Sequence, residues 1–185
     1  MLAVQELSIP GVKLVRPRVF DDPRGTMTEV AHDARFRELG FPDFVQENQS
    51  FSRLRGTIRG MHFQKPPQAQ AKLVRVLRGQ IFDVAVDVRP QSASFGRHAV
   101  AMLSEDELAW LYVPEGFAHG FCTLTKDVQV LYKVSSYYAP GSECGMRWND
   151  PALGIDWPIS PSEAVLSDKD MQLPLFKDLP AVIWG

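Results

Sequence analysis

Three side chains in this sequence could together move a proton on a carbon atom next to a ketone. His62 is a candidate base, Lys72 is a cation at the start of an apolar run, and Tyr132 is a phenolic acid. Histidine titrates near neutral pH, which suits a general base, and a fixed ammonium can stabilise an enolate oxygen. All three lie in segments typical of β-strands, which hold catalytic groups more rigidly than loops do.

Each of these residues also has an ordinary structural interpretation. A lone His62 can be a hydrogen-bonded core histidine, Lys72 a solvated strand end, and Tyr132 a core tyrosine whose hydroxyl is satisfied. Strict alternation along a strand places Arg59 and His62 on opposite faces. The catalytic interpretation therefore requires a bulge at Gly60 that turns both side chains toward one cavity.

The rest of the chain predicts the elements that must position these groups. Short apolar runs are separated by Gly, Pro, Asp and Asn at a spacing of about 8–12 residues, which is typical of an all-β sandwich or barrel. One short helix is expected at 33–39, ending at Gly40, and Ser167 is expected to cap another. Strands are expected at 12–19, 26–30, 44–52, 57–63, 72–78, 80–88, 97–103, 110–113, 119–124, 128–137 and 145–148.

The clearest alternation in the sequence runs through residues 82–88. Phe82 and three valines at every second position alternate with Asp83, Ala85 and Asp87. This pattern predicts a strand with one buried face and one polar face.

Length and composition indicate one globular domain over residues 1–185. Its C-terminal part, from about residue 160, is expected to be irregular and loosely held beyond Pro174. No basic run indicates nucleic-acid binding, and no apolar stretch approaches the roughly 18 residues of a membrane span. Cys122 and Cys144 form no C-x-x-C pair and predict a cytoplasmic protein without disulfides.

Other kinds of chemistry find little support in the sequence. A metal site is disfavoured because His62 lacks the H-x-H pairing of metal-binding β-barrels, and because His119 has no carboxylate nearby in the sequence. There is no glycine-rich phosphate loop and no G-x-S-x-G nucleophile motif. Arg24 is either a surface charge in a turn or a ligand for a diphosphate.

A polar stripe on one predicted strand could recognise a ligand. Gln46, Asn48 and Ser50 share a strand face, whereas Glu47 points away. Such a stripe is either solvated or able to read the edge of a nucleobase. Tyr138, at the end of another predicted strand, could stack on a base.

Taken in order, these segments resemble the dTDP-4-dehydrorhamnose 3,5-epimerase family, a cupin-type jelly roll. The similarity extends from about residue 5 to residue 175. The matching segments include Phe20-Asp21-x-x-Arg24-Gly25-x-x-x-Glu29, Gln46-x-Asn48-x-Ser50, Arg59-Gly60-x-His62-Phe63-Gln64, Gln70-x-Lys72-Leu73-Val74, Asp83-Val84-Ala85-Val86-Asp87-x-Arg89, Gly116-Phe117-Ala118-His119-Gly120-Phe121, Tyr132-Lys133, Tyr137-Tyr138 and Leu166-Ser167-x-Lys169-Asp170.

The resemblance implies a role for each matching residue. His62 would be the base, oriented by Asp170 as in a protease triad. Lys72, helped by His119, would steady the C4 oxyanion, and Tyr132 would be the acid on the opposite face of the sugar. Tyr138 would stack on the thymine ring. The other substrate contacts would be Arg24, Glu29, Gln46, Glu47, Asn48, Arg59, Glu143 and Lys169.

The resemblance also implies a homodimer in which the N-terminal strands of one chain help to build the partner's site. Arg24 and Glu29 would then serve the neighbouring subunit. The implied reaction is a cofactor-free and metal-free epimerisation of dTDP-4-dehydro-6-deoxy-D-glucose at C3 and C5, in dTDP-L-rhamnose biosynthesis. The alternatives are an epimerase that acts at C3 or C5 only, a 3,4-ketoisomerase, a non-catalytic cupin that binds a sugar nucleotide, and a metal-dependent cupin oxygenase.

Overall fold

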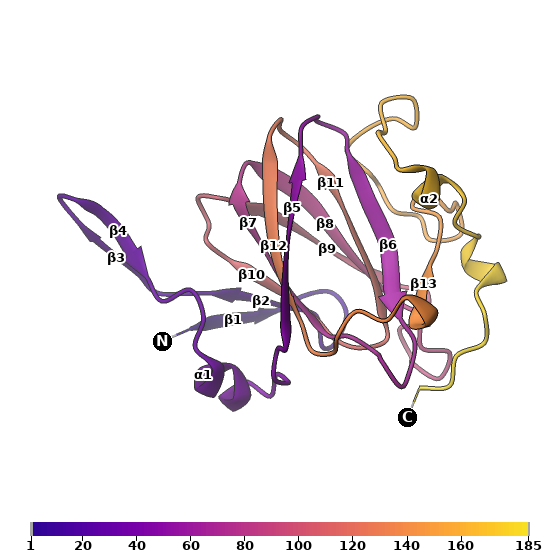
Figure 1. Cartoon of the computed structure of the whole chain (residues 1–185), viewed down its shortest axis with the longest axis horizontal. Helices are drawn as coiled ribbons and strands as arrows, with labels where there is room; N and C mark the ends of the chain where they lie inside the picture. Colours follow the sequence, from indigo (N-terminus) through magenta and orange to yellow (C-terminus); the bar gives the residue numbers. More distant parts are fainter. Residues whose placement is uncertain (1, 185) are drawn as a thin grey trace.

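Two antiparallel β-sheets face each other across an apolar core in the computed structural model, which describes residues 2–184 (Figure 1). The six-stranded sheet has the order β1 (Ala3–Glu6), β2 (Lys13–Arg16), β10 (Trp110–Val113), β7 (Lys72–Arg78), β12 (Val128–Val134) and β5 (Gln46–Ser52). The five-stranded sheet has the order β13 (Glu143–Gly145), β6 (Ile58–Gln64), β11 (Phe117–Thr123), β8 (Gln80–Asp87) and β9 (His98–Ser104). This double-sheet jelly roll confirms the predicted all-β fold.

The core lies between the sheets because alternate side chains of facing strands point inward. Val74 and Val130 of the six-stranded sheet pack in the same cluster as Ile81, Ala85 and Phe121 of the five-stranded sheet. Burying an aliphatic or aromatic side chain of this size contributes about 1.5–3 kcal/mol. The two sheets therefore form a rigid frame for any side chain that stands at their open end.

Strand β8 corrects the prediction made from its alternation, because both of its faces are buried. Val84 and Val86 pack beneath the C-terminal part of the chain. Asp83 and Asp87, on the opposite face, are fully buried toward the other sheet. The alternation identified two chemically different faces correctly, but the polar face is covered by protein rather than by water.

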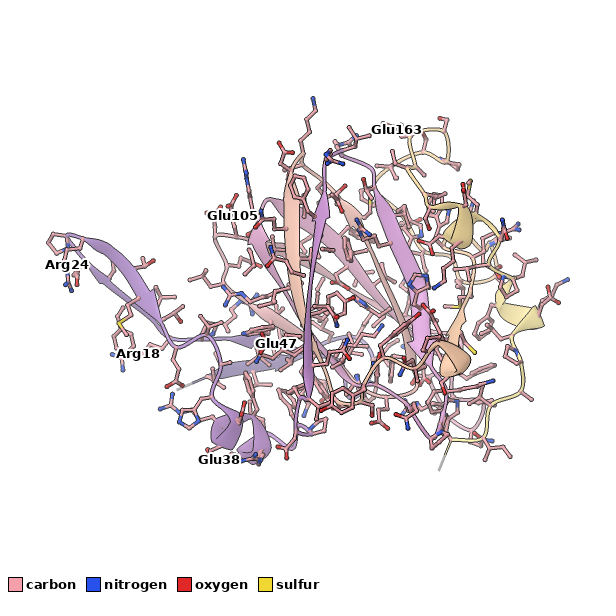
Figure 2. All side chains as sticks on the ribbon, viewed as in Figure 1. Arg18, Arg24, Glu38, Glu47, Glu105 and Glu163 are labelled. Carbon is pink, nitrogen blue, oxygen red and sulfur yellow. The ribbon has the colours of Figure 1, made fainter. Side chains whose placement is uncertain are left out.

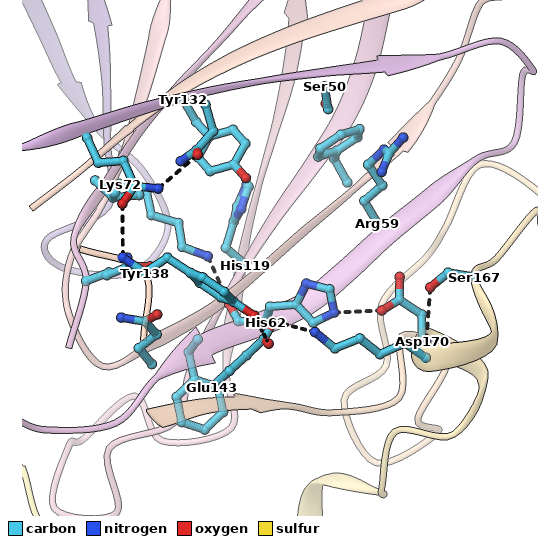
Figure 3. A pocket seen from close by; sticks show the side chains of 18 residues that line it. Ser50, Arg59, His62, Lys72, His119, Tyr132, Tyr138, Glu143, Ser167 and Asp170 are labelled. Carbon is cyan, nitrogen blue, oxygen red and sulfur yellow. Dashed lines mark hydrogen bonds and ion pairs between the residues drawn. The ribbon is translucent and has the colours of Figure 1, made fainter. Parts of the chain in front are cut away.

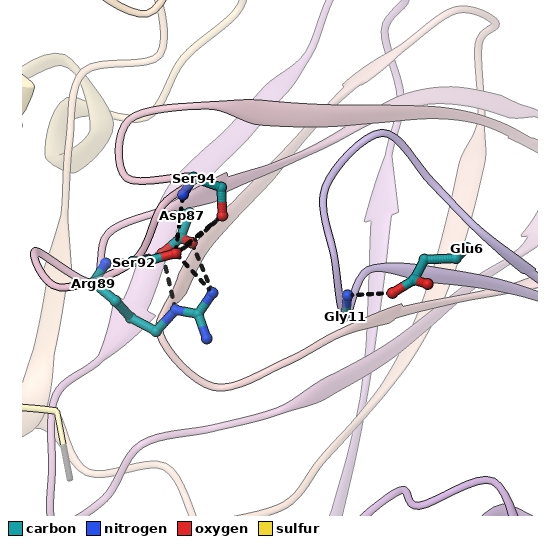
Figure 4. Close-up of polar contacts among 6 residues, drawn as sticks. All are labelled: Glu6, Gly11, Asp87, Arg89, Ser92 and Ser94. Atoms are coloured by element: carbon teal, nitrogen blue, oxygen red, sulfur yellow. Dashed lines mark hydrogen bonds and ion pairs between the residues drawn. The ribbon is translucent and has the colours of Figure 1, made fainter.

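The buried Asp87 carboxylate is satisfied by a ring of donors (Figure 4). The Arg89 guanidinium donates to both carboxylate oxygens, and the hydroxyls of Ser92 and Ser94 donate to Oδ2 at 2.6 and 2.7 Å. Burial opposes ionisation, but these hydrogen bonds together hold the pKa of Asp87 below its usual value. This cluster fixes the turn that connects β8 to β9.

The C-terminal segment packs on the outer face of the five-stranded sheet, which overturns the expectation of a loose end (Figure 1). Phe176 and Leu179 join the apolar cluster around Phe63. The backbone N–H of Phe176 donates to Asp150 Oδ2 at 2.6 Å, in the short 3-10 helix η2 (Phe176–Asp178). This packing holds the short helix α2 (Asp168–Met171) beside β6.

The N-terminal region differs from the expected strand pattern. The expected strand 12–19 corresponds to the shorter β2, and a separate strand, β3 (Val19–Asp22), begins where the expected strand ends. Strand β3 forms an exposed hairpin with β4 (Gly25–Thr28) that projects from the sheets (Figure 1). Strand β1 was missed because all four of its residues are exposed and carry no apolar alternation. The predicted helix is confirmed as α1 (Asp33–Glu38), and the connection before β13 contains the 3-10 helix η1 (Pro140–Ser142).

The state of the cysteines and the length of the helices were both subjects of expectations from the sequence. Cys122 is buried in β11, and both it and Cys144 carry free thiols. Within residues 2–184, no helix is long and apolar enough to cross a membrane.

Candidate active site

A cavity of about 450 Å³ lies between the two sheets, and Figure 3 shows the side chains that line it. Its lining comes from strands of both sheets and from α2, so residues far apart in sequence converge on it. The predicted site residues that line this cavity are His62, Lys72, Tyr132, Asp170, Gln46, Asn48, Arg59, His119, Tyr138, Glu143 and Lys169.

A β-bulge brings Arg59 and His62 to the same cavity. On the neighbouring strand β11, His119 pairs with His62, but the register then shifts before the pairing that involves Arg59. Gly60 has a φ of +118°, and a side chain there would stand 2.5 Å from the Cα of Gly120. Only glycine fits at this close approach of the β6 and β11 backbones. The bulge that the catalytic interpretation required is therefore confirmed.

His62 and Asp170 form a hydrogen-bonded pair. His62 Nε2 lies 2.6 Å from Asp170 Oδ1, across a separation of 108 residues in the sequence. Ser167 caps α2 by accepting the backbone N–H of Asp170 at 3.2 Å, which fixes the carboxylate. Because Asp170 uses Nε2, Nδ1 is the ring nitrogen of His62 without a hydrogen-bond partner among the described residues.

The Asp170 carboxylate is arranged to stay ionised. It is only 5% exposed, and burial by itself raises its pKa. The hydrogen bond and charge of His62 oppose this effect, helped by the N–H of Gly60 and by Ser167, and the net pKa lies below the ordinary value. An ionised Asp170 can hold the ring of His62 and stabilise it when it takes up a proton.

Lys72 is buried in the cavity wall rather than solvated at a strand end. Its Nζ donates to the backbone carbonyl of His62 at 3.0 Å. Burial lowers the pKa of Lys72 to about 8, while the charges of Asp83 and Glu143 act in the opposite direction. The Lys72 ammonium is therefore held close to His62.

Tyr132 reaches the cavity from the sheet opposite His62. It lies on β12, paired with Asn48 of β5 and Val74 of β7, whereas His62 lies on β6 of the five-stranded sheet. Burial raises the pKa of Tyr132, so that its hydroxyl stays protonated at neutral pH. The arrangement places His62 and Tyr132 on opposite walls of one cavity.

A connected group of polar side chains lines the mouth of the cavity. The hydroxyl of Tyr138 donates to Glu143 at 2.8 Å, and Lys169 forms an ion pair with the same carboxylate at 2.6 Å. The backbone N–H of Tyr138 donates to Gln46, whose amide donates to Asn48 at 2.9 Å. An exposed aromatic ring beside a cation and amide groups suits a ligand with a flat polar ring.

Arg59 is anchored by β5. Its Nε donates to the Ser52 hydroxyl and its Nη2 to the Phe51 carbonyl, both at 3.0 Å. These bonds hold the guanidinium at the cavity wall, where it can meet an anionic group of a ligand.

Three of the predicted substrate contacts lie away from the cavity of their own chain. Glu47 lies on the outward face of β5, where it forms an ion pair with Lys133. Arg24 lies at the tip of the β3–β4 hairpin (Figure 2). Glu29 follows that hairpin and pairs with Arg35 at 2.6 Å. Strand alternation explains Glu47, because its neighbours Gln46 and Asn48 point inward.

Asp83 is not among the predicted site residues, although its carboxylate bonds to His119 Nε2 at 2.7 Å. The available signal was a carboxylate in the alternation of residues 82–88, but the partner lies 36 residues away. No group of three or more His, Cys, Asp or Glu side chains that could hold a metal ion is found in residues 2–184.

The model of the dTDP-4-dehydrorhamnose 3,5-epimerase family matches residues 6–178. The chain belongs to this family. A family member of the same name from Sinorhizobium fredii is 49% identical over 177 residues, which are 95% of this chain and 90% of that protein. The resemblance inferred from the ordered motifs is thereby confirmed.

Solved structures of the family share the fold of this chain. The epimerase of Legionella pneumophila, in complex with dTDP-4-keto-L-rhamnose, superposes with a TM-score of 0.91 at 38% identity, covering 96% of this chain and 94% of that chain. A 3'-monoepimerase from Streptomyces bikiniensis, in complex with dTDP-quinovose, gives 0.86 at 36% identity, covering 92% and 86%. Both are similar at a level that indicates common fold and ancestry.

Proposed function

We propose that this epimerase-family chain converts dTDP-4-dehydro-6-deoxy-D-glucose to dTDP-4-dehydro-L-rhamnose by inverting C5 and C3. The observation that carries the proposal is the placement of His62 and Tyr132 on opposite walls of one cavity that also contains Lys72. Inversion needs this geometry, because one group must remove a proton from one face of the carbon and another must return a proton to the other face.

The proposed reaction begins at the carbon next to the C4 ketone. His62 Nδ1 accepts the C5 proton, and the electron pair of the broken C–H bond moves toward the C4 oxygen to form an enolate. Lys72 and His119 stabilise the negative oxygen. Tyr132 then delivers its proton to C5 from the opposite face, and the ketone forms again. The same sequence at C3, after proton exchange with solvent, completes the double inversion without net oxidation or reduction.

The polar mouth of the cavity supports a nucleotide-binding role. Tyr138, which is half exposed, would stack on the thymine ring, and Gln46 and Asn48 would bond its edge. Arg59 would bind the diphosphate, and Lys169 together with Glu143 would bind the deoxyribose.

The proposed test is proton NMR in deuterium oxide with dTDP-4-keto-6-deoxyglucose. We expect deuterium at both C5 and C3 and a product that a 4-keto-rhamnose reductase consumes. Replacing His62 with alanine should lower the rate by about 10²–10⁴-fold. Tyr132→Phe should retain exchange at C5, since the base is intact, but should lose inversion. Absence of any exchange with this substrate would refute the proposed activity.

Epimerisation at one carbon only is the second candidate. It is favoured by the likeness to the 3'-monoepimerase, whose fold matches over most of both chains. The same NMR experiment separates the two functions, because exchange confined to C3 or to C5 identifies a mono-epimerase.

We also propose a homodimer in which the β3–β4 hairpin reaches the partner's cavity. Support comes from the projecting hairpin, whose Phe20 and Met27 are exposed apolar residues (Figure 1). Arg24 and Glu29 are also not among the described residues that line the cavity of their own chain. Sedimentation equilibrium tests the dimer. When inactive Arg24→Ala and His62→Ala chains are mixed in equal amounts, half of the dimers should contain one chain of each kind. One of the two sites in each mixed dimer would be complete, so about one quarter of wild-type activity should return. No restoration would contradict the exchange of hairpins.

A cytoplasmic location is proposed on the basis of the thiols. Cys122 and Cys144 are both free, as expected in a reducing compartment. Fractionation of cells that produce the protein tests this, and recovery outside the cytoplasm would contradict it.

A further inference from the structure

Asp83 is a buried carboxylate directly behind the cavity. It lies on β8, is fully inaccessible to solvent, and places Oδ1 2.7 Å from Nε2 of His119. Its second oxygen, Oδ2, is also buried and has no hydrogen-bond partner among residues 2–184. Burying a carboxylate with a bare oxygen is costly unless a nearby positive charge balances it.

The buried cation whose charge interacts with that of Asp83 is Lys72. This ammonium is only 8% exposed and makes one hydrogen bond, to the backbone carbonyl of His62. Burial lowers the pKa of Lys72 to about 8, and the charges of Asp83 and Glu143 raise it against that effect. The titratable side chains that line the same cavity include His62 on β6, His119 on β11, Tyr132 on β12, Glu143 on β13 and Asp170 on α2, and the charge of Asp83 on β8 acts on Lys72 from outside this lining.

The site therefore contains two histidine–carboxylate pairs of similar geometry. In both, Nε2 of the ring bonds the carboxylate, at 2.6 Å for His62 with Asp170 and at 2.7 Å for His119 with Asp83. The side chain of His62 is 28% exposed, but that of His119 is only 9% exposed. The first pair is open enough to receive a proton from carbon, whereas the second lies deeper in the cavity wall.

Building on the proposed epimerase activity, we propose that Asp83 is a positioning residue, which holds the His119 ring through Nε2 and supplies the negative charge beside the Lys72 ammonium. A carboxylate at Nε2 accepts the proton that the ring carries there, and it also stabilises the imidazolium form of the ring. In the imidazolium form Nδ1 carries a proton as well, and this N–H can donate to the enolate oxygen. The enolate oxygen is then stabilised by His119, whose ring orientation depends on Asp83, and by Lys72, whose positive charge depends on Asp83. No proton needs to leave Asp83 during the reaction.

The decisive variant is Asp83→Asn, which keeps the shape of the side chain and removes its charge. The rate of deuterium incorporation at C5 is measured for wild type and variant from about pH 6 to about pH 10. In wild type the rate should fall above about pH 8, as Lys72 loses its proton. In Asp83→Asn the fall should move to lower pH by about 1–3 units, and kcat at the plateau should decrease by about 10-fold or more with little change in KM.

Asp87→Asn is the matched control. Asp87 lies on the same strand and the same face, is equally buried, and bonds Arg89, Ser92 and Ser94 instead of a cavity residue. Its variant should unfold more easily but keep the wild-type pH profile. If Asp83→Asn keeps the wild-type alkaline limb, or if both variants move it equally, the proposal for Asp83 is refuted while the epimerase activity of the wild type stands.

A second measurement on the wild-type protein does not depend on the variant folding or on activity. The ¹⁵N shifts of the histidine rings, assigned with a His119→Gln variant, report which nitrogen carries the proton. We expect the Nε2–H tautomer for neutral His119. A ring protonated at Nδ1 alone would overturn the proposed role of Asp83. A wild type that shows this tautomer but no exchange at C5 or C3 would instead refute the proposed function.

Discussion

Replacing Gly60 with alanine should damage both the stability of the fold and the geometry of the site. The added Cβ would stand 2.5 Å from the Cα of Gly120 and 2.6 Å from the carbonyl oxygen of His119, which are backbone atoms that cannot rotate away. Strain at a φ of +118° costs about 1–3 kcal/mol, and relieving the overlap costs about 1–3 kcal/mol more. The free energy of unfolding should therefore decrease by about 2–6 kcal/mol.

The activity of Gly60→Ala should fall for a geometric reason. The bulge is what turns Arg59 and His62 to the same cavity, and a displacement of about 1 Å can cost about 10²-fold in rate. Urea denaturation gives the stability, and deuterium exchange at C5 gives the activity of the folded fraction.

Gly25→Ala provides a control with a similar backbone conformation. Gly25 has a φ of +122°, but a Cβ there would have nothing within 4 Å. This variant measures backbone strain alone and should lose about 1–3 kcal/mol. Equal losses for the two variants, or a Gly60→Ala enzyme of wild-type activity, would contradict the role assigned to the bulge.

Three further substitutions test separate parts of the structure. Asp170→Asn should lower kcat by about 10²–10⁴-fold, because His62 loses the charge that stabilises its protonated form. A rate within twofold of wild type would contradict the pairing. Asp87→Ala should destabilise the fold by about 3–5 kcal/mol at neutral pH. Folding lowers the pKa of Asp87, so the stability that its charge contributes is fully present above the unfolded-state pKa of about 3.9. That stability is lost as pH falls through the folded-state pKa. The free energies of unfolding of wild type and variant, measured by urea denaturation, should therefore converge in acid. Glu47→Ala, which removes a surface ion pair with Lys133, should change stability by about 1 kcal/mol or less and leave KM unchanged; a large rise in KM would place this residue in the site.

The bulge at Gly60 illustrates what the sequence could predict. The chemistry required Arg59 and His62 on one side of a strand, and alternation alone placed them on opposite sides, so a glycine between them had to interrupt the register. The structure contains that interruption. A requirement of this kind is predictable because it depends on a few neighbouring residues and on strand geometry.

The surroundings of β8 illustrate what the sequence could not predict. Alternation separates the residues of a strand into two sets, but it does not say which set will be covered and by what. Asp83 and Asp87 are buried by partners in other elements. The burial of Val84 and Val86 depends on the C-terminal segment, whose packing follows from tertiary contacts rather than from any local periodicity. Long-range partners of this kind require the whole fold.

The connection between His62 and Asp170 has a consequence for the order in which the protein is made. Synthesis proceeds from the N-terminus, so β6 and His62 leave the ribosome well before α2, and the segment that anchors α2 follows later still. A nascent chain that stops before Asp170 would contain every strand of both sheets but not the carboxylate that orients the base. If His62 is the base, proton abstraction becomes efficient only after Asp170 has been synthesised and α2 has packed beside β6, and chains that stop earlier are expected to turn ligand over poorly.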